Sequence, residues 1–350
     1  MSGTEWIDEP EYYRERDLTV YHEELADFLP ERVFDVHCHV YRLEDKSREP
    51  TSRERDESFG ATERAFTAED LRECHSMLFP GKQVESLVFG MPSAFASIPH
   101  QNGYVARLVR RGGVAGLALL DPAADAEELR RLVVEGGFLG LKPYHRLVPK
   151  PEGEEVSIPE MVPQAARQVA DELGLIIMLH VPRATRIADP ANVREVCELC
   201  RECPNAQVIL AHVGRSYGPW FIEQAIGALR ELPNLSYDIA ALDDAETIGV
   251  VLDNVPHERL LFGTDLPVTA YRGKHLCVNR QCLFLTRRRL PWSISSDKPG
   301  ELKLTFFAYE TVRALRRVCE HRGLSRAHVN DICYDNARRL IDAAGTRASS

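Results

Sequence analysis

Eight short apolar runs, separated by helical patterns, limit what this chain of 350 residues can fold into. Most of the runs are apolar throughout, which is typical of strands covered on both faces. Eight strands alternating with helices predict a closed parallel barrel or an open doubly wound sheet. The count favours the α/β fold known as the (β/α)8 TIM barrel, as does the lack of a G-x-G-x-x-G or P-loop motif. The runs cover residues 33–40, 85–91, 114–120, 138–143, 175–180, 207–213, 235–240 and 259–265.

Three segments do not follow the repeat of strands and helices. We expect an N-terminal extension over 1–32, a single barrel domain over 33–342 and a tail over 343–350, with loop insertions at about 41–66 and 268–300. Both insertions follow strand ends on the side where barrel active sites are built, so they are expected to cover part of a pocket. The C-terminal part, from 304 to 345, reads as two amphipathic helices packed on the barrel.

Charge and hydropathy exclude several classes of partner. The formal net charge is −10, whereas proteins that bind nucleic acids or membrane surfaces generally carry a basic face. The N-terminus is acidic and lacks the pattern of a signal peptide, and no apolar run is long enough to span a bilayer. We therefore expect a cytoplasmic protein that binds neither nucleic acid nor membrane.

Nine cysteines, an odd number spread along the chain, do not indicate a secreted disulfide framework. Reduced thiols are the expectation. The dense group Cys197, Cys200 and Cys203 has a spacing that an iron–sulfur cluster could use. It lies in a helical pattern with no fourth ligand nearby, so we expect buried apolar side chains.

Five residues with ligand chemistry stand at strand ends. His37 and His39 are two residues apart in the first run, so a strand would point both imidazoles to one side and Cys38 to the other. Taken alone, the pair is either a metal site or a coincidence. His180, His212 and Asp265 end the fifth, sixth and eighth runs or lie beside those ends. The C-terminal ends of parallel barrel strands converge on one face, which predicts one shared cavity.

The motifs FDVHCHV, GLKPYH, IIMLHVPR, VILAHVGR and LLFGTDLP resemble the amidohydrolase superfamily. They are most similar to its branch with aminocarboxymuconate semialdehyde decarboxylase and several small lactonases. The resemblance covers residues 33 to 270, and NDICYDNARRLI is similar to the family's last helix. It implies that His37, His39, His180 and Asp265 bind one divalent ion. The donor set suits Zn²⁺, with Mn²⁺, Fe²⁺ or Co²⁺ as alternatives.

The same resemblance implies roles around that ion. A metal-bound water would have its pKa lowered toward about 7 and could attack a substrate carbonyl. His212 is similar to the branch's histidine that orients or deprotonates this water. Asp265 would shuttle a proton while remaining a ligand, so His212 and Asp265 are the expected catalytic residues.

Three further residues are expected to face the substrate. Lys142 lies at the fourth strand, after which superfamily members with two metals carry a carboxylated lysine as a bridge. The branch generally uses one ion, which favours a substrate-facing or structural lysine over a bridging one. Tyr144 could donate to a substrate, and a loop aromatic is the plainer interpretation. Arg183 could bind a carboxylate through its guanidinium, or it could stabilise its own loop.

The leading hypothesis is therefore a metal-dependent hydrolase that directs activated water at a small, carboxylated substrate such as a lactone. A metal-dependent, non-oxidative decarboxylase of a small unsaturated or aromatic acid is the second hypothesis. A third hypothesis is a non-catalytic barrel that binds a partner. A homo-oligomer also stays open, because nothing in the sequence identifies an interface.

Overall fold

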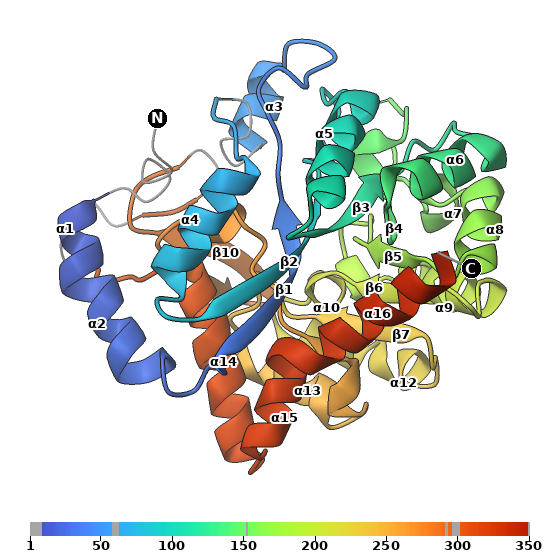
Figure 1. Cartoon of the computed structure of the whole chain (residues 1–350). Coiled ribbons are helices and arrows are strands. Elements are labelled where there is room, and N and C mark those ends of the chain that lie inside the picture. Colours follow the sequence, from blue (N-terminus) through green and yellow to red (C-terminus); the bar gives the residue numbers. More distant parts are fainter. Residues whose placement is uncertain (1–8, 58–62, 152, 291–292, 296–301, 349–350) are drawn as a thin grey trace.

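A computed structural model describes residues 9–57, 63–151, 153–290, 293–295 and 302–348. Eight parallel strands form one sheet in the order β1 to β8, with helices around the outside (Figure 1). Every apolar run overlaps one strand, which confirms the predicted (β/α)8 barrel. The strands are β1 Arg32–His39, β2 Gln83–Phe89, β3 Ala115–Leu119, β4 Gly140–Lys142, β5 Ile176–Leu179, β6 Gln207–Leu210, β7 Leu235–Asp238 and β8 Leu260–Leu261.

Backbone hydrogen bonds between β1 and the segment after β8 join the two ends of the sheet. The Val36 amide donates to the Phe262 carbonyl at 3.1 Å. Farther along, Asp265 donates to the His37 carbonyl at 2.8 Å, and His39 donates to Leu266 at 2.8 Å. The first strand is therefore fastened to the segment that carries Asp265.

The connecting helices begin and end with the expected signals. Thr67 and Asp70 form a capping box at α4, and Asp125 and Glu128 form one at α6, so otherwise orphaned backbone amides are satisfied. The helices between strands are α3 Ser52–Glu57, α4 Ala68–Leu78, α5 Ile98–Arg111, α6 Ala126–Gly136, α7 Ile158–Met161, α8 Gln164–Glu172, α9 Pro190–Glu202, α10 His212–Arg215, α11 Pro219–Glu223, α12 Ile226–Leu229 and α13 Ala245–Leu252.

Helices at both ends of the chain pack on the barrel. The N-terminal helical segment comprises α1 Pro10–Tyr12, η2 Tyr13–Asp17, α2 Leu18–Val20 and η3 Tyr21–Leu25. The C-terminal helices are α14 Phe307–His321, α15 Arg326–Asn330, η8 Asp331–Asp335 and α16 Asn336–Ala348. Side chains of η8 and α16 join the inward-facing strand residues in one apolar cluster, so this end of the chain contributes to the inner core.

A β-bulge in β1 decides which side chains enter the barrel. The register between β1 and β2 shifts between Asp35 and Cys38, which adds one residue to β1. Phe34 and Val36 belong to the inner apolar cluster, whereas Cys38 belongs to the layer between strands and helices. A regular strand would alternate without this interruption, but the bulge lets His37 follow Val36 toward the interior.

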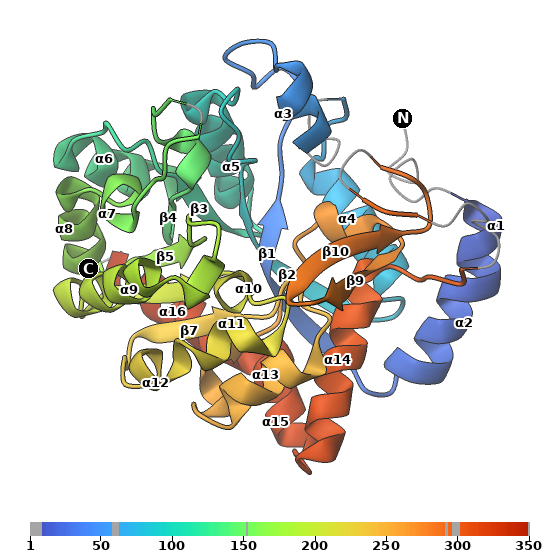
Figure 2. The same ribbon diagram turned by 180° about the vertical axis from the view of Figure 1, so that it is seen from behind.

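The insertion at 268–300 contains secondary structure that was not predicted from the sequence. Strands β9 Gly273–Val278 and β10 Gln281–Thr286 pair as an antiparallel hairpin (Figure 2). Cys277 and Cys282 lie opposite each other and form a disulfide, so the expectation of reduced thiols is wrong for this pair. Cys197, Cys200 and Cys203 are free and buried in the apolar core, as expected.

The proposed domain boundaries stay predictions. Parts of the N-terminal extension, the two insertions and the tail lie outside the described residues, at 1–8, 58–62, 291–292, 296–300 and 349–350. Among the described residues, no helix combines the length and the apolar character needed to cross a membrane.

Asp35 connects β1 to two other elements in the core. Its fully buried carboxylate accepts hydrogen bonds from His75 Nε2 of α4 at 2.9 Å and from the Thr264 amide at 2.8 Å. The hydroxyl of Thr264 and the amide of His37 donate to it as well. Unpaired donors would remain in the core if this carboxylate were lost.

Asp35→Asn should therefore lower the free energy of unfolding by about 2–3 kcal/mol, because an amide would turn its NH2 group toward donors. Urea unfolding followed by circular dichroism measures the change. Asp253→Asn is the control, since it breaks an exposed ion pair with Arg322 and should cost less than about 1 kcal/mol. Equal losses in the two variants would contradict the role given to Asp35.

Candidate metal centre

The polar side chains expected at the site do lie at the C-terminal ends of the barrel strands. His37 and His39 are among the last three residues of β1, and Lys142 ends β4. His180 follows β5 directly and His212 opens α10 after β6, while Asp265 lies in the segment after β8. One further polar residue, Asp238, was not predicted from the sequence and ends β7 beside them.

Three of the four predicted metal ligands converge. His39 Nε2 lies 3.2 Å and His37 Nε2 lies 3.5 Å from Asp265 Oδ1. All three ligand atoms are within 4.8 Å of one another, and all three residues are buried. Asp265 has a φ of 65°, a left-handed backbone conformation that costs energy for a residue with a Cβ. Two imidazoles and a carboxylate in this arrangement fit a divalent cation.

Hydrogen bonds behind the two imidazoles orient them. His37 Nδ1 donates to Asp238 Oδ2 at 3.0 Å, and His39 Nδ1 donates to the Gly90 carbonyl at 3.1 Å. With a proton on each Nδ1, each Nε2 keeps its lone pair, and both Nε2 atoms lie within 3.5 Å of Asp265 Oδ1. Such partners fix the tautomer and ring orientation of metal-binding histidines. The local structure therefore favours ligation through both Nε2 atoms.

The fourth predicted ligand, His180, lies beside this group. It is not one of the residues whose ligand atoms are all within 4.8 Å of one another. Its ring is 5.6 Å from the ring of His212 and 4.7 Å from that of Tyr144. Its Nδ1 is buried and makes no hydrogen bond within the part of the chain that the structure describes. A buried nitrogen without a partner is costly, so this imidazole is suited to an ion or a substrate.

His212 is held with one nitrogen left for proton transfer. Its backbone amide donates to Asp238 Oδ1 at 2.9 Å, and its Nδ1 donates to the Ala240 carbonyl at 2.7 Å. Its ring stacks on the His37 ring with centroids 4.7 Å apart. Because Nδ1 carries the proton, Nε2 is the atom that can accept one.

Asp238 joins the two histidines through one carboxylate. It is fully buried and accepts from the His37 ring, the His212 amide and the Ala240 amide. Burial raises the pKa of Asp238, while His212 and Lys142 act in the opposite direction. The signal for Asp238 in the sequence was a single carboxylate inside the apolar run 235–240, at the same strand end as the ligands.

Lys142 lies inside the cluster. Its Nζ is 3.4 Å from His37 Nε2 and 4.5 Å from the centre of the Phe89 ring. Burial lowers the pKa of Lys142 to about 8, against the opposing charges of Asp238 and Asp265. A group with this pKa is still mostly protonated at pH 7, so it places a cation beside the metal donors.

The two loop residues expected to contact the substrate differ in their surroundings. Tyr144 packs against the His180 ring and belongs to the site. Arg183 pairs with Glu195 through two hydrogen bonds of 2.7 and 2.9 Å, and it also donates to Asn192. These contacts favour a structural role for Arg183, and its role as a substrate contact stays a prediction.

A cavity of about 690 Å³ opens between the segments that follow β1, β2 and β4. Its lining includes Arg48, Phe95, His145 and Lys150. The ring of His145 stacks on the ring of His180 at 5.9 Å, so the cavity adjoins the site at this histidine. A small organic molecule fits a space of this size.

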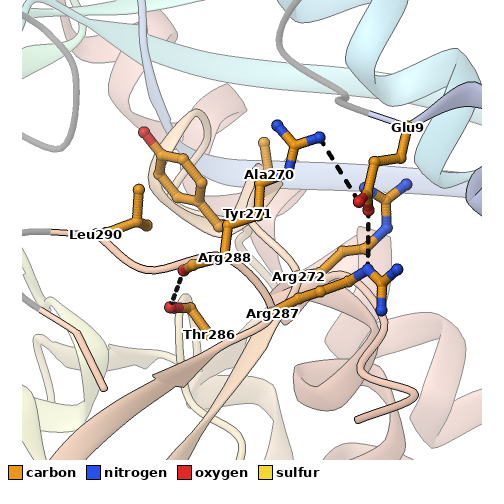
Figure 3. A pocket seen from close by; sticks show the side chains of 8 residues that line it. All are labelled: Glu9, Ala270, Tyr271, Arg272, Thr286, Arg287, Arg288 and Leu290. Carbon is orange, nitrogen blue, oxygen red and sulfur yellow. Dashed lines mark hydrogen bonds and ion pairs between the residues drawn. The ribbon is translucent and has the colours of Figure 1, made fainter. Parts of the chain in front are cut away.

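A second pocket lies between the N-terminal segment and the insertion after β8 (Figure 3). Glu9 lies between Arg272 and Arg287, at 3.8 and 2.8 Å, with Arg288 at 3.6 Å. The pocket holds only about 30 Å³, close to the volume of one water molecule. These ion pairs attach the insertion to the N-terminal segment.

Comparisons with known proteins agree with the barrel fold. A protein-family model described as Amidohydrolase matches residues 34–342. No curated protein matches the chain. Among solved structures, an amidohydrolase from Burkholderia multivorans with bound HEPES is 15% identical, with a TM-score of 0.57 over 89% of this chain and 99% of its own.

Two other solved structures carry reaction names. The 2,6-dihydroxybenzoate decarboxylase from Rhizobium is 15% identical, with a TM-score of 0.52 over 90% of this chain and 99% of its own. A probable 2-pyrone-4,6-dicarboxylic acid hydrolase from Acinetobacter baumannii with bound citric acid is 12% identical, with a TM-score of 0.53 over 89% and 99%. At these identities, the similarity shows the fold.

Asp238→Asn should weaken zinc binding by about 10- to 100-fold, because the amide holds the His37 ring less well than a carboxylate does. Zinc titration against a competing chelator measures the affinity. Asp243→Asn is a matched control: Asp243 is also buried and hydrogen-bonded to a histidine Nδ1, that of His275 at 2.8 Å, but neither residue is a proposed metal ligand. Wild-type zinc affinity in Asp238→Asn would contradict the assignment.

Proposed function

Because the chain belongs to the amidohydrolase family, we propose that it is a metal-dependent hydrolase of a small, carboxylated substrate such as a lactone. The observation that supports this most directly is the convergence of His37 Nε2, His39 Nε2 and Asp265 Oδ1 next to the oriented His212. Members of one barrel fold support many reactions, so the proposal depends on the site.

His37, His39 and Asp265 would hold the ion, with His180 as the further ligand. A bound divalent ion, Zn²⁺ in this proposal and Mn²⁺, Fe²⁺ or Co²⁺ as alternatives, would acidify a water molecule and polarise the substrate carbonyl. The protein's part is to fix the donors: the Asp265 amide donates to the His37 carbonyl, so two donors share one backbone contact.

His212 is proposed as the residue that takes the proton from the attacking water. Its Nε2 is free to accept, since Nδ1 donates to Ala240. In lactone hydrolysis the water oxygen forms a bond to the carbonyl carbon, the ring C–O bond breaks, and the leaving oxygen gains a proton. Asp265 lies beside the donors and is proposed to pass on that proton while remaining a ligand.

Lys142 and Tyr144 are proposed to bind the substrate. The ammonium group of Lys142 lies 3.4 Å from His37 Nε2, so a carboxylate there would meet a buried cation. Tyr144 packs on His180 and would form a wall beside it. Together they support an anionic substrate next to the ion.

Non-oxidative decarboxylation is the second candidate. It is favoured by the fold likeness to the Rhizobium protein, whose name is that of a decarboxylase. In that reaction, His212 or Asp265 would give a proton to the carbon that loses the carboxylate. The two reactions differ in whether water is consumed and carbon dioxide released.

Incubation of the zinc-loaded protein with 2-pyrone-4,6-dicarboxylate and with 2,6-dihydroxybenzoate, in water enriched in oxygen-18, separates the candidates. We expect the lactone to open with one heavy oxygen in the new carboxylate and no carbon dioxide from either acid. Mass spectrometry of the products and a carbon dioxide assay measure this. Carbon dioxide release without label uptake would replace the hydrolase by the decarboxylase.

His212→Asn should lower kcat by about 100- to 10,000-fold, because general-base catalysis is lost, while the zinc content stays at the wild-type value. Chelation of the ion should abolish turnover, and added Zn²⁺ should restore it. Steady-state kinetics and elemental analysis make the comparison, with the exposed His321→Asn as control. Full activity in His212→Asn would remove this residue from the reaction.

A further inference from the structure

Tyr217 lies where three loops at the mouth of the barrel meet. It follows α10, and its ring contacts an imidazole and a guanidinium from two other loops. The His275 imidazole of β9 stacks on it at 4.4 Å with an interplanar angle of 24°. The Arg186 guanidinium, from η5 Arg186–Ala188, lies 4.7 Å from its centre. None of these three residues lies in a motif that predicts a site.

One partner of Tyr217, the His275 ring, is itself fixed. Asp243 accepts from the His275 amide at 2.7 Å and from its Nδ1 at 2.8 Å. The His275 ring also packs on Phe284 at 4.5 Å. The opposite strands of this hairpin are joined by the disulfide described above, and both of its sulfur atoms lie within 3.5 Å of the Tyr217 carbonyl. The phenol ring is therefore held in one orientation.

This orientation places the ring next to the metal donors. Its centre is 6.4 Å from the centre of the His212 ring, which in turn stacks on His37. Burial raises the pKa of Tyr217 to about 12, with Arg215 and Arg186 opposing and Asp265 reinforcing the shift. At neutral pH the hydroxyl is therefore protonated and able to donate.

The hydroxyl of Tyr217 is not used by the protein. It makes no hydrogen bond to any described residue, whereas the hydroxyls of Tyr13 and Tyr21 donate to the Met77 and Pro80 carbonyls at 2.8 Å. The Tyr217 side chain is half-buried, so its hydroxyl is open to a molecule that enters the site. Tyr217 thus has a donor to spare on the side of the barrel where the ligands lie.

The charge around this donor favours an anion. Arg186 forms no ion pair with a described residue, and its buried Nη1 has no hydrogen-bond partner among them. Its guanidinium lies over the rings of Tyr217 and Phe221, both at 4.7 Å. A partly buried positive charge without a carboxylate partner stabilises a negative group brought beside it.

We propose that Tyr217 is a substrate-binding residue whose hydroxyl donates a hydrogen bond to a carboxylate of the substrate, with Arg186 supplying the positive charge beside it. The inference rests on the proposed function, since it concerns the substrate of that site. It adds a recognition element built by the loops after β5, β6 and β8, separate from Lys142 inside the barrel. Its role is binding and orientation, which a structural tyrosine would not have.

Tyr217→Phe tests the hydroxyl alone, because the ring and its stacking stay. Isothermal titration of the zinc-loaded full chain with 2,6-dihydroxybenzoate and with citrate measures carboxylate binding, and resorcinol serves as the probe without a carboxylate. We expect the affinity for both acids to fall by about 10- to 100-fold and that for resorcinol to stay unchanged. Tyr13→Phe, which loses a hydroxyl far from the donors, should bind all three as the wild type does.

Arg186→Met is the second variant, since it removes the charge and leaves the Tyr217 hydroxyl in place. It should also weaken binding of both acids at least tenfold. Wild-type affinity for the acids in both variants would overturn the proposal, as would failure of either acid to bind the zinc-loaded wild type. Carboxylate binding that depends on Tyr217, together with no opening of 2-pyrone-4,6-dicarboxylate by the same protein, would instead contradict the proposed function and leave this inference standing.

Discussion

The hydrogen bond from the Asp265 amide to the His37 carbonyl closes both the barrel and the site. At 2.8 Å, it joins the first strand to the segment after the last one. A proposed metal ligand stands at each end of this bond, so the positions of the two side chains are determined by the sheet itself. Residues more than two hundred positions apart therefore converge without a flexible loop between them. The strands of the barrel therefore hold the proposed metal donors in fixed positions.

Burial of so many polar groups near this bond has a cost that only mutual contacts offset. Asp35, Asp238 and Lys142 are almost completely buried. Each carboxylate accepts several hydrogen bonds, which replaces the water it loses. Asp35 turns outward to α4, whereas the bulge in β1 lets His37 point inward, where Asp238 of β7 accepts a hydrogen bond from its ring. One irregularity in a strand thus separates the core carboxylate Asp35 from the site residue His37.

Much of this arrangement could be predicted, because parallel strands covered on both faces are apolar throughout and their ends share one side. That reasoning found the eight strands and placed His37, His39 and Asp265 together. It could not find the hairpin β9–β10, whose two-residue turn is Asn279-Arg280. Both residues have positive φ, at 51° and 63°. Glycine at the second position would have predicted such a turn, but the residue there is Arg280. The disulfide went unpredicted with it, since Cys277 and Cys282 face each other only in that hairpin register.

Side-chain pairing limits such prediction more than backbone pattern does. Arg183 and Arg186 are three residues apart on one loop, and both carry a guanidinium that suits a carboxylate. Glu195, which α9 brings back toward the loop, pairs with Arg183, whereas Arg186 turns onto the Tyr217 ring. The choice between them depends on how a helix packs, which spacing along the chain does not encode. The barrel can therefore be read from local pattern, while its substrate specificity depends on contacts between loops that follow different strands.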